Sequence, residues 1–375
     1  ISGGGGTVCI PTIPSHGRAM ATKEVPSEGN EKSSDFPVLD LSKFLKDPDS
    51  AEEDCKLVAK MFHETGLLIV KDPRVSMEHN DTFIDNMEKF YELDLKAKME
   101  TVHPEYHYQI GATPEGVEQA RNHCERAKGM ADEDRPVTEC PPGKDPKWRY
   151  FWRIGKRPEK TDFKQLNVSN VIPKQIPGWE KCMDTWGSLI MQTVRTVTQM
   201  AADGFGLERN VFIKLMENGP HLLAPTGSDL SKYAKKDTAF ASYHYDLNFI
   251  TIHGKSRFPG LYVWTRDNKR RAVKMPPGCL LLQAGKQFEW LTGGYVLAGF
   301  HEVVVSDATI AAKKKAEAAG KSTWRVSSTL FSHIASDNTL TPLGKFEKAK
   351  DASKYPATKA GVQVSEELKA IKLEA

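Results

Sequence analysis

Two residues that could bind a metal ion stand close together in the stretch SYHYDLNFITIH, residues 242–253. His244 and Asp246 are two positions apart, and alternate residues of a β-strand project from the same face. The imidazole and the carboxylate would therefore form a chelating pair ahead of an alternating apolar segment. A hydrogen-bonded pair on a strand explains the same tripeptide, so this motif alone does not establish a metal site.

A second histidine strengthens the metal hypothesis. His301 stands at the head of an apolar segment, in LAGFHEVVV, several strand-like segments further along the chain. Two histidines and one carboxylate form a facial triad that leaves three positions open, a ligand set expected of non-haem Fe(II) oxygenases rather than of closed structural zinc sites. The sequence therefore predicts an Fe(II) site formed by His244, Asp246 and His301.

A candidate anion site follows in the segment WRVSSTLF. Arg325 and Ser327 are again two positions apart on a predicted strand, so their side chains face the same side. A guanidinium fork together with a hydroxyl group can bind a carboxylate. The predicted site thus combines a metal ion with an anion-binding pair.

The elements that must position these residues change character near Phe240. Before it, apolar residues at steps of three and four predict helices over residues 51–66, 77–95 and 179–204, with a buried strand over 67–70. After it the apolar period is two, and turn residues separate short runs that include NFITI, GLYVW, GCLLLQ, FEWLTGG and YVLAGFHEVVV. Many short strands are typical of a sandwich or a barrel.

The predicted fold class is therefore α+β with a mainly β core, a jelly roll against which an N-terminal helical region packs. We expect a flexible or tag-like tail over residues 1–35, a helical and mixed region over 36–210, the β core over 211–345 and a C-terminal extension over 346–375. A Lys-rich insertion at 306–322 interrupts the core and is expected to be a solvated surface segment, with a basic partner-binding patch as the alternative.

Composition restricts the classes of partner. The chain has 375 residues with 52 basic and 49 acidic side chains, so no strong field favours nucleic acid or a membrane surface. No stretch approaches 18 consecutive apolar residues. The six scattered cysteines fit reduced thiols in the cytoplasm. We expect a soluble protein, monomeric by preference, that acts on a small molecule.

An ordered set of segments resembles the isopenicillin N synthase-like family of Fe(II)/2-oxoglutarate-dependent dioxygenases. The segments, between Phe36 and His333, are FPVLDLSKF, GLLIVKDPRV, HYD, FPGLYVW, WLTGGYV, FHEVVV and RVS. The resemblance implies a double-stranded β-helix in which His244, Asp246 and His301 hold Fe(II). It also implies that Arg325 and Ser327 bind the far carboxylate of 2-oxoglutarate, and that a small metabolite is oxidised with O2, by hydroxylation as the default, releasing succinate and CO2.

The chain departs from the family pattern at three places. Ala224 precedes Pro225 where an Asn or Tyr near a YP pair commonly touches the cosubstrate, Glu302 follows His301 where arginine is usual, and the Lys-rich insertion lengthens the spacing from His301 to Arg325. These departures leave open which side chain supplies the missing cosubstrate contact.

Two other functions remain open at this point. One is an Fe(II) oxidase like isopenicillin N synthase, which needs no 2-oxoglutarate; the other is a non-catalytic binding protein on the same scaffold, against which the intact triad argues. His253 is expected to be a core or surface histidine rather than a fourth ligand. In the aromatic segment of residues 148–155, Arg149 and Arg153 could meet an acidic substrate.

Overall fold

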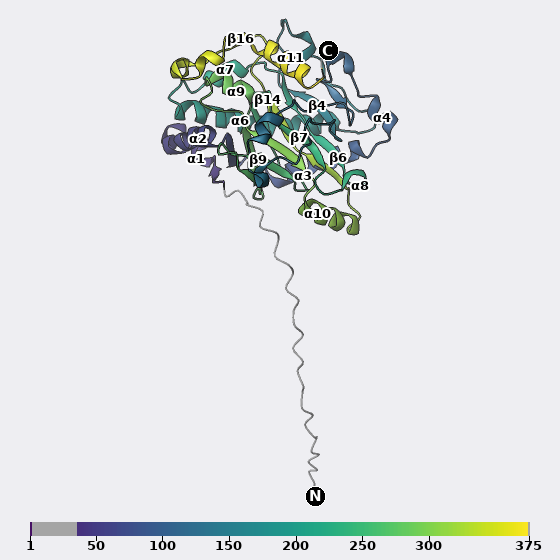
Figure 1. Cartoon of the computed structure of the whole chain (residues 1–375). Helices are drawn as coiled ribbons and strands as arrows, with labels where there is room; N and C mark the ends of the chain where they lie inside the picture. Colours follow the sequence, from purple (N-terminus) through teal and green to yellow (C-terminus); the bar gives the residue numbers. More distant parts are fainter. Residues whose placement is uncertain (2–35, 374–375) are drawn as a thin grey trace. The chain divides into compact units, whose positions relative to one another are not determined.

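The computed structural model describes residue 1 and residues 36–373 (Figure 1). The tail predicted for residues 1–35 therefore lies, apart from Ile1, outside the described residues. From residue 36 onward the described chain lies in one compact unit that contains both helices and strands. The predicted mixture of helical and β elements is confirmed.

Strands from both halves of the chain share one large sheet. Its order is β1-β2-β11-β8-β14-β5-β4-β6-β13, and β3 pairs with β4. The pair β1–β2 is parallel, whereas the other strand pairs are antiparallel. The strands of this sheet are β1 (Val38–Asp40), β2 (Leu67–Lys71), β3 (Gly111–Thr113), β4 (Trp148–Ile154), β5 (His221–Leu223), β6 (Thr226–Asp229), β8 (Ile250–His253), β11 (Cys279–Ala284), β13 (Trp324–Ser327) and β14 (Thr329–Ser332).

A smaller antiparallel sheet carries two of the predicted metal ligands. Its order is β10-β9-β12-β7. The strands are β7 (Ala239–Tyr245), β9 (Leu261–Trp264), β10 (Arg270–Ala272) and β12 (Phe300–Val304), and a separate pair consists of β15 (Thr339–Leu340) and β16 (Thr358–Lys359). Strand β12 lies between β7 and β9, so it is held from both sides.

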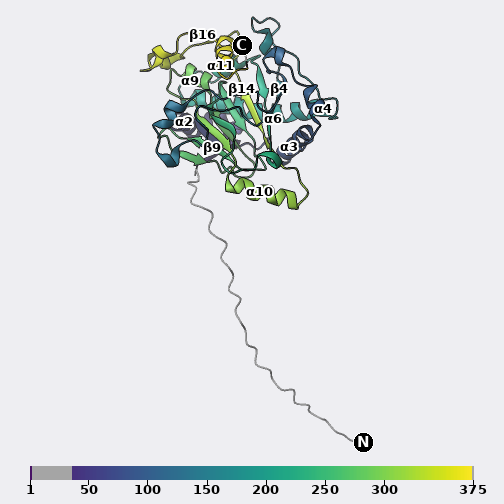
Figure 2. The ribbon, with the colours of Figure 1, turned by 45° about the vertical axis from the view of Figure 1, so that its right-hand side comes forward.

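The helices surround these sheets, with α10 and α11 at opposite ends of the compact unit (Figures 1 and 2). They are α1 (Ser42–Lys46), α2 (Glu52–Glu64), α3 (Met77–Tyr91), α4 (Leu95–Met99), α5 (Cys124–Lys128), α6 (Trp179–Gly204), α7 (Val211–Met216), α8 (Leu230–Tyr233), α9 (Lys286–Leu291), α10 (Asp307–Ala318) and α11 (Ala360–Ala370). Among the described residues, no helix combines the length and the apolar character needed to cross a membrane.

Helix α6 is the long core helix that the spacing of apolar residues predicts. The residues at steps of three and four are all buried: Trp179, Met183, Trp186, Ile190, Val194, Val197 and Ala201. At its C-terminal end, a side chain on Gly204 would collide with the backbone carbonyl of Cys55 on α2. Glycine therefore allows α2 and α6 to pack closely, which supports the sheet beneath them.

The prediction of a strand over residues 288–294 is wrong, because the segment begins in helix α9. Phe288 and Leu291, three positions apart, are fully buried. The ring of Phe288 packs edge-on against Phe62 and Phe249, with centroid separations of 5.2 and 4.9 Å. A short apolar run does not distinguish a strand from a buried helical turn. Here the aromatic contacts select the helix.

The Lys-rich insertion forms helix α10 between β12 and β13. Its lysines Lys314 and Lys315 are exposed, in agreement with a surface segment. Its other side is packed against the protein, because Ile310, Ala312 and Ala316 contact a buried apolar cluster. That cluster consists of Leu230, Phe240, Phe258 and Val305. The insertion is therefore part of the packed structure.

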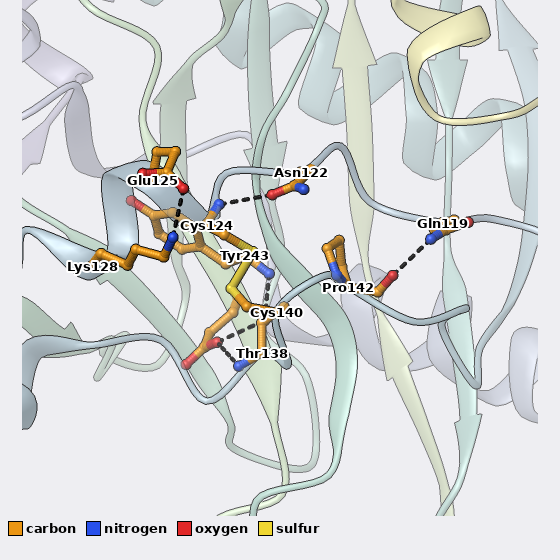
Figure 3. Close-up of a disulfide and its surroundings, with 10 residues drawn as sticks. Gln119, Asn122, Cys124, Glu125, Lys128, Thr138, Cys140, Pro142 and Tyr243 are labelled. Atoms are coloured by element: carbon orange, nitrogen blue, oxygen red, sulfur yellow. Dashed lines mark hydrogen bonds and ion pairs between the residues drawn. A yellow bond between two sulfur atoms is a disulfide. The ribbon is translucent and has the colours of Figure 1, made fainter.

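The prediction that all cysteines are reduced is wrong for two of them, because Cys124 and Cys140 form a disulfide (Figure 3). Cys55, Cys182 and Cys279 are free. The loop that contains the pair packs on β7, where Thr138 Oγ1 accepts a hydrogen bond of 2.6 Å from the backbone N–H of Tyr243. A spacing of 16 residues does not reveal such a pairing. The expectation of a cytoplasmic location was based on reduced thiols, and the disulfide removes that basis.

Glu302, which stands where the family resemblance leads one to expect arginine, holds the same loop. Its fully buried carboxylate accepts hydrogen bonds from the backbone N–H of Val137 and the side chain of Thr138, both at 3.1 Å, and pairs with Arg270 at 3.0 Å. Burial raises the pKa of Glu302 although Arg270 and the loop donors oppose that effect. The departure at this position thus has a structural explanation.

We expect the disulfide to stabilise the protein without being required for its fold. Replacing Cys124 and Cys140 together by serine should lower the free energy of unfolding by about 3 kcal/mol, the value expected for a loop of this length. Folding should persist because Glu302 still holds the loop. Urea unfolding of the double variant and of a Cys182→Ser control measures the effect.

Equal stability of the double variant and the wild type would contradict the disulfide. So would thiol labelling of the unfolded protein in which prior reduction exposes no additional thiols.

Candidate active site

The three predicted metal ligands lie together. His244 is on β7, Asp246 follows directly after that strand, and His301 on β12 is the direct pairing partner of His244. Asp246 Oδ1 is 3.6 Å from His244 Nε2 and 3.9 Å from His301 Nε2. One ligand atom from each residue lies within 4.8 Å of the others, and no further cluster of this kind occurs in the described part of the chain.

A surrounding group of polar atoms orients each of the three side chains. His244 Nδ1 donates to the carbonyl of Ser242 at 2.6 Å, which leaves Nε2 directed at the other two residues. Thr251 Oγ1 donates to Asp246 Oδ2 at 2.6 Å, and Gln283 Nε2 is 2.8 Å from His301 Nδ1. The contacts of His244 and Asp246 orient these two side chains as a metal ion requires, and the contact with Gln283 fixes the position of the His301 ring.

The protonation states of Asp246 and His301 suit metal binding, whereas for His244 burial is outweighed by the hydrogen bond with Asp246, which raises the pKa of that imidazole. Burial opposes ionisation of Asp246, but the ring of His301 and the hydrogen bond with His244 outweigh it and hold the pKa of that carboxyl well below its usual range. Burial, together with the nearby His244, lowers the pKa of His301 to about 3. An ionised carboxylate and a neutral imidazole are the forms in which these groups bind metals.

A cavity of about 400 Å³ connects this triad with the predicted anion-binding pair. Arg325 and Ser327, both on β13, line the cavity together with His244, Asp246 and His301. Arg325 is 4% exposed, and its Nε donates to the carbonyl of Pro259 at 3.2 Å. Burial lowers the pKa of its guanidinium to about 10. No described carboxylate forms an ion pair with Arg325.

A row of hydroxyl groups continues from Ser327 through the same cavity. Ser327 Oγ is 2.7 Å from Thr226 Oγ1 and 3.3 Å from Thr329 Oγ1. His253 Nδ1 in turn is 3.0 Å from Thr329 Oγ1, and its Nε2 is buried without a partner among the described residues. His253 is not among the clustered ligand atoms, as expected, but it lines the cavity. Ala224 lines it too.

A second cavity of about 90 Å³ lies on another side of the triad. Five residues line both cavities: Glu118, Arg149, His244, Asp246 and Phe331. Helix α11 contributes Glu367 and Leu368 to the smaller one, so the C-terminal extension reaches the candidate site. This role could not be predicted, because an ordinary amphipathic helix carries no functional motif.

The two arginines of the aromatic segment have different surroundings. Arg149 lines both cavities, whereas Arg153 lines neither of them. The guanidinium of Arg153 donates to Asn167 at 2.8 Å and to the backbone carbonyls of Asn218 and Gly219 at 3.0 and 3.1 Å. These contacts give Arg153 a structural role.

The other described histidines differ in their position relative to the cavities. His103 and His107 line neither cavity. His333 lines the smaller cavity, and burial lowers its pKa to about 3, which keeps it neutral. Sequence reasoning missed Thr226, Thr251, Gln283 and Thr329, because isolated hydroxyl and amide residues on strands become recognisable only when the strand order is known.

Comparison with known proteins agrees with this geometry. Residues 36–175 match the model of the N-terminal region of the non-haem dioxygenase in morphine synthesis, and residues 228–334 match the 2OG-Fe(II) oxygenase superfamily. Azadirone synthase LFS of Melia azedarach is 21% identical over 280 residues, which are 69% of this chain and 76% of that protein.

Solved structures show the same fold. A putative 2OG-Fe(II) oxygenase family protein from Caulobacter crescentus superposes with a TM-score of 0.71 at 22% identity, covering 90% of this chain and 100% of that one. Neurospora crassa T7H in complex with alpha-KG and thymine gives a TM-score of 0.69 at 18% identity, covering 89% and 96%. The chain thus belongs to the 2OG-Fe(II) oxygenase superfamily, with the N-terminal region of the non-haem dioxygenases, and is an oxidoreductase with Fe(II) and 2-oxoglutarate as cofactors.

Proposed function

We propose that His244, Asp246 and His301 are the Fe(II) ligands of an enzyme that hydroxylates a small organic molecule. The donor set fits the ion, because two imidazoles and one carboxylate suit Fe(II) and leave coordination positions open. The side chain of His244 is 24% exposed, against 6% for Asp246 and for His301, so the ligand set is open toward one side. That side faces the 400 Å³ cavity.

The buried guanidinium of Arg325 is the observation that carries the proposal. A buried cation is normally paired with an anion, because its desolvation is otherwise uncompensated. Arg325 has no carboxylate partner among the described residues, yet it lines the cavity that contains the triad. The far carboxylate of 2-oxoglutarate would supply the missing charge, with Ser327 as a hydrogen-bond donor.

The hydroxyl row offers a replacement for the contact that Ala224 cannot make. Thr226 and Thr329 flank Ser327 and line the same cavity. We infer that one of these hydroxyls makes the cosubstrate contact for which the family commonly uses Asn or Tyr.

With Fe(II) and 2-oxoglutarate bound, the cofactors supply the activation of O2, with release of succinate and CO2. The chain's own contribution is to orient the ligands, to bind the cosubstrate carboxylate and to keep water from the reacting centre. T7H binds the small molecule thymine. For this chain we likewise infer a small organic substrate, no nucleic acid or membrane partner, and a monomer.

The finer architecture belongs to the same proposal. We infer that the sheets of residues 211–345 form a double-stranded β-helix, that residues 36–210 pack against it and that the extension of residues 346–375 covers the smaller cavity. The contribution of α11 to that cavity supports the last point.

Removing any one ligand should abolish metal binding without unfolding the chain. We expect His244→Ala, Asp246→Ala and His301→Ala each to weaken Fe(II) binding by more than about a hundredfold, since losing even a supporting contact costs ten- to a hundredfold. Anaerobic Fe(II) titration, with circular dichroism as the check on folding, measures this. His103→Ala, on the surface and outside both cavities, is the control. A ligand variant with full iron affinity would exclude that residue from the site.

Thr251→Val should weaken Fe(II) binding more mildly, by about ten- to a hundredfold, because it removes the donor to Asp246 while keeping the side-chain shape. The matched control is Thr198→Val, which removes a buried hydroxyl on α6 that bonds to the carbonyl of Arg195. If both variants bound Fe(II) like the wild type, Thr251 would have no part in orienting the carboxylate.

Arg325→Gln should raise the 2-oxoglutarate concentration needed for half-maximal turnover by about a hundredfold, since losing a charge-assisted contact costs about 2 to 3 kcal/mol. Ser327→Ala should raise it less, because one neutral donor is lost. O2 uptake and succinate formation at saturating iron provide the measurement. Wild-type turnover that proceeds unchanged without 2-oxoglutarate would instead favour an Fe(II) oxidase of the isopenicillin N synthase type.

A further inference from the structure

One edge of the Arg149 guanidinium has no hydrogen-bond partner among the described residues. Arg149 lies on β4 and is 7% exposed. Its Nη1 donates to Glu118 Oε2 at 2.6 Å. Its Nε and Nη2 are buried without a hydrogen-bond partner in the described part of the chain. Leaving charged donors buried and unpaired is costly, so this edge calls for a ligand.

The open edge has the shape of a carboxylate site. The N–H groups of Nε and Nη2 lie on the same side of the planar guanidinium and point in parallel, which matches the two oxygens of a carboxylate. The chain contains such a pair elsewhere, because Arg74 donates from Nε and Nη2 to the two oxygens of Asp72 at 2.9 and 2.6 Å. In Arg149 the equivalent two N–H groups have no hydrogen-bond partner in the described part of the chain.

Arg149 lies beside the reacting centre. Arg149 lines both cavities, which adjoin each other at His244 and Asp246. The apolar part of the smaller cavity's lining consists of Phe151, Leu222, Leu247, Phe331, Leu368 and Ile371, and charged side chains, Glu367 among them, line the rest. A molecule placed there would have its polar end at Arg149 and its apolar body near the triad.

The surrounding charges hold the guanidinium without occupying its open edge. Glu118 accepts from Arg149 and, at 3.2 Å, from Lys147, which also pairs with Asp145 at 2.6 Å. These two cations and two anions cancel, and Asp246, Glu367 and Arg121 also line the smaller cavity. The geometry of the open edge, rather than an excess of positive charge, therefore selects its ligand.

We propose that Arg149 binds a carboxylate of the organic substrate, and that the substrates are small carboxylic acids with an apolar body. This inference rests on the proposed function, since it places the substrate beside the Fe(II) ligands. The cross-strand partner of Arg149 is Thr226, which pairs in turn with Ser327, so the same edge is also close to the proposed 2-oxoglutarate site. The test must therefore distinguish the two carboxylates.

The experiment uses the full chain loaded anaerobically with Fe(II) and 2-oxoglutarate. Its probes are phenylacetate, cyclohexanecarboxylate and indole-3-acetate, each compared by calorimetry with the primary amide of the same skeleton. We expect the acids to bind at least about tenfold more tightly than their amides. Arg149→Lys, which keeps the charge but lacks the fork, should remove most of that preference. Arg153→Lys, on the same strand but outside both cavities, should leave it unchanged.

A second experiment measures 2-oxoglutarate binding. The Fe(II)-loaded protein is titrated anaerobically with 2-oxoglutarate, and the visible absorption of the chelate that the cosubstrate forms with Fe(II) is followed. We expect Arg149→Lys to leave this titration unchanged. Acids that bind no better than amides, or no binding by any probe, would overturn the inference. A variant that loses 2-oxoglutarate affinity while keeping the preference for acids would assign the open edge to the cosubstrate instead. Absence of the chelate in the wild-type protein would contradict the proposed function itself.

Discussion

The antiparallel pairing of β7 with β12 is the constraint on which the candidate site depends. In this register His301 lies opposite His244, and Asp246 follows two residues after His244. A shift by one residue would turn one histidine to the other face of the sheet. Strand β9 holds β12 from its other side, with His301 opposite Val263, which fixes the register further. The cavities, the anion-binding pair and the supporting contacts are all arranged around this pairing.

Some buried charges have partners within the chain, and others lack them and so indicate ligand sites. Glu302 is satisfied by Arg270 and by the loop that the disulfide closes, so it needs no ligand. Arg325 has no carboxylate partner among the described residues, Nε and Nη2 of Arg149 have no hydrogen-bond partner there, and both side chains line the cavities around the triad. Since buried charges are rarely left unpaired, these two arginines mark the places where ligands are expected.

The sequence was most informative where chemistry and periodicity coincide over a few residues. The triad could be predicted because His244 and Asp246 share a strand face and His301 begins another strand, and Arg325 with Ser327 followed the same logic. The apolar period likewise predicted α6. These patterns are local, so they can be recognised without knowledge of the strand order.

Other features could not be predicted because they arise from contacts between distant segments. Helix α9 depends on aromatic contacts with Phe62 of α2 and with Phe249, just before β8. A short apolar run does not reveal these contacts. The disulfide depends on how a loop packs on β7. The open edge of Arg149 could be recognised only after Glu118 was seen to occupy one side of the guanidinium.

We propose that one cavity holds both Fe(II), on the triad, and 2-oxoglutarate, on Arg325. Anaerobic titration of the iron-loaded wild-type protein with 2-oxoglutarate, followed by visible absorption, detects the two bound together. A chelate band should develop, saturate at about one 2-oxoglutarate per chain and disappear when His301 is replaced by alanine. Iron that binds fully while no band develops at any 2-oxoglutarate concentration would show that the cavity does not hold both.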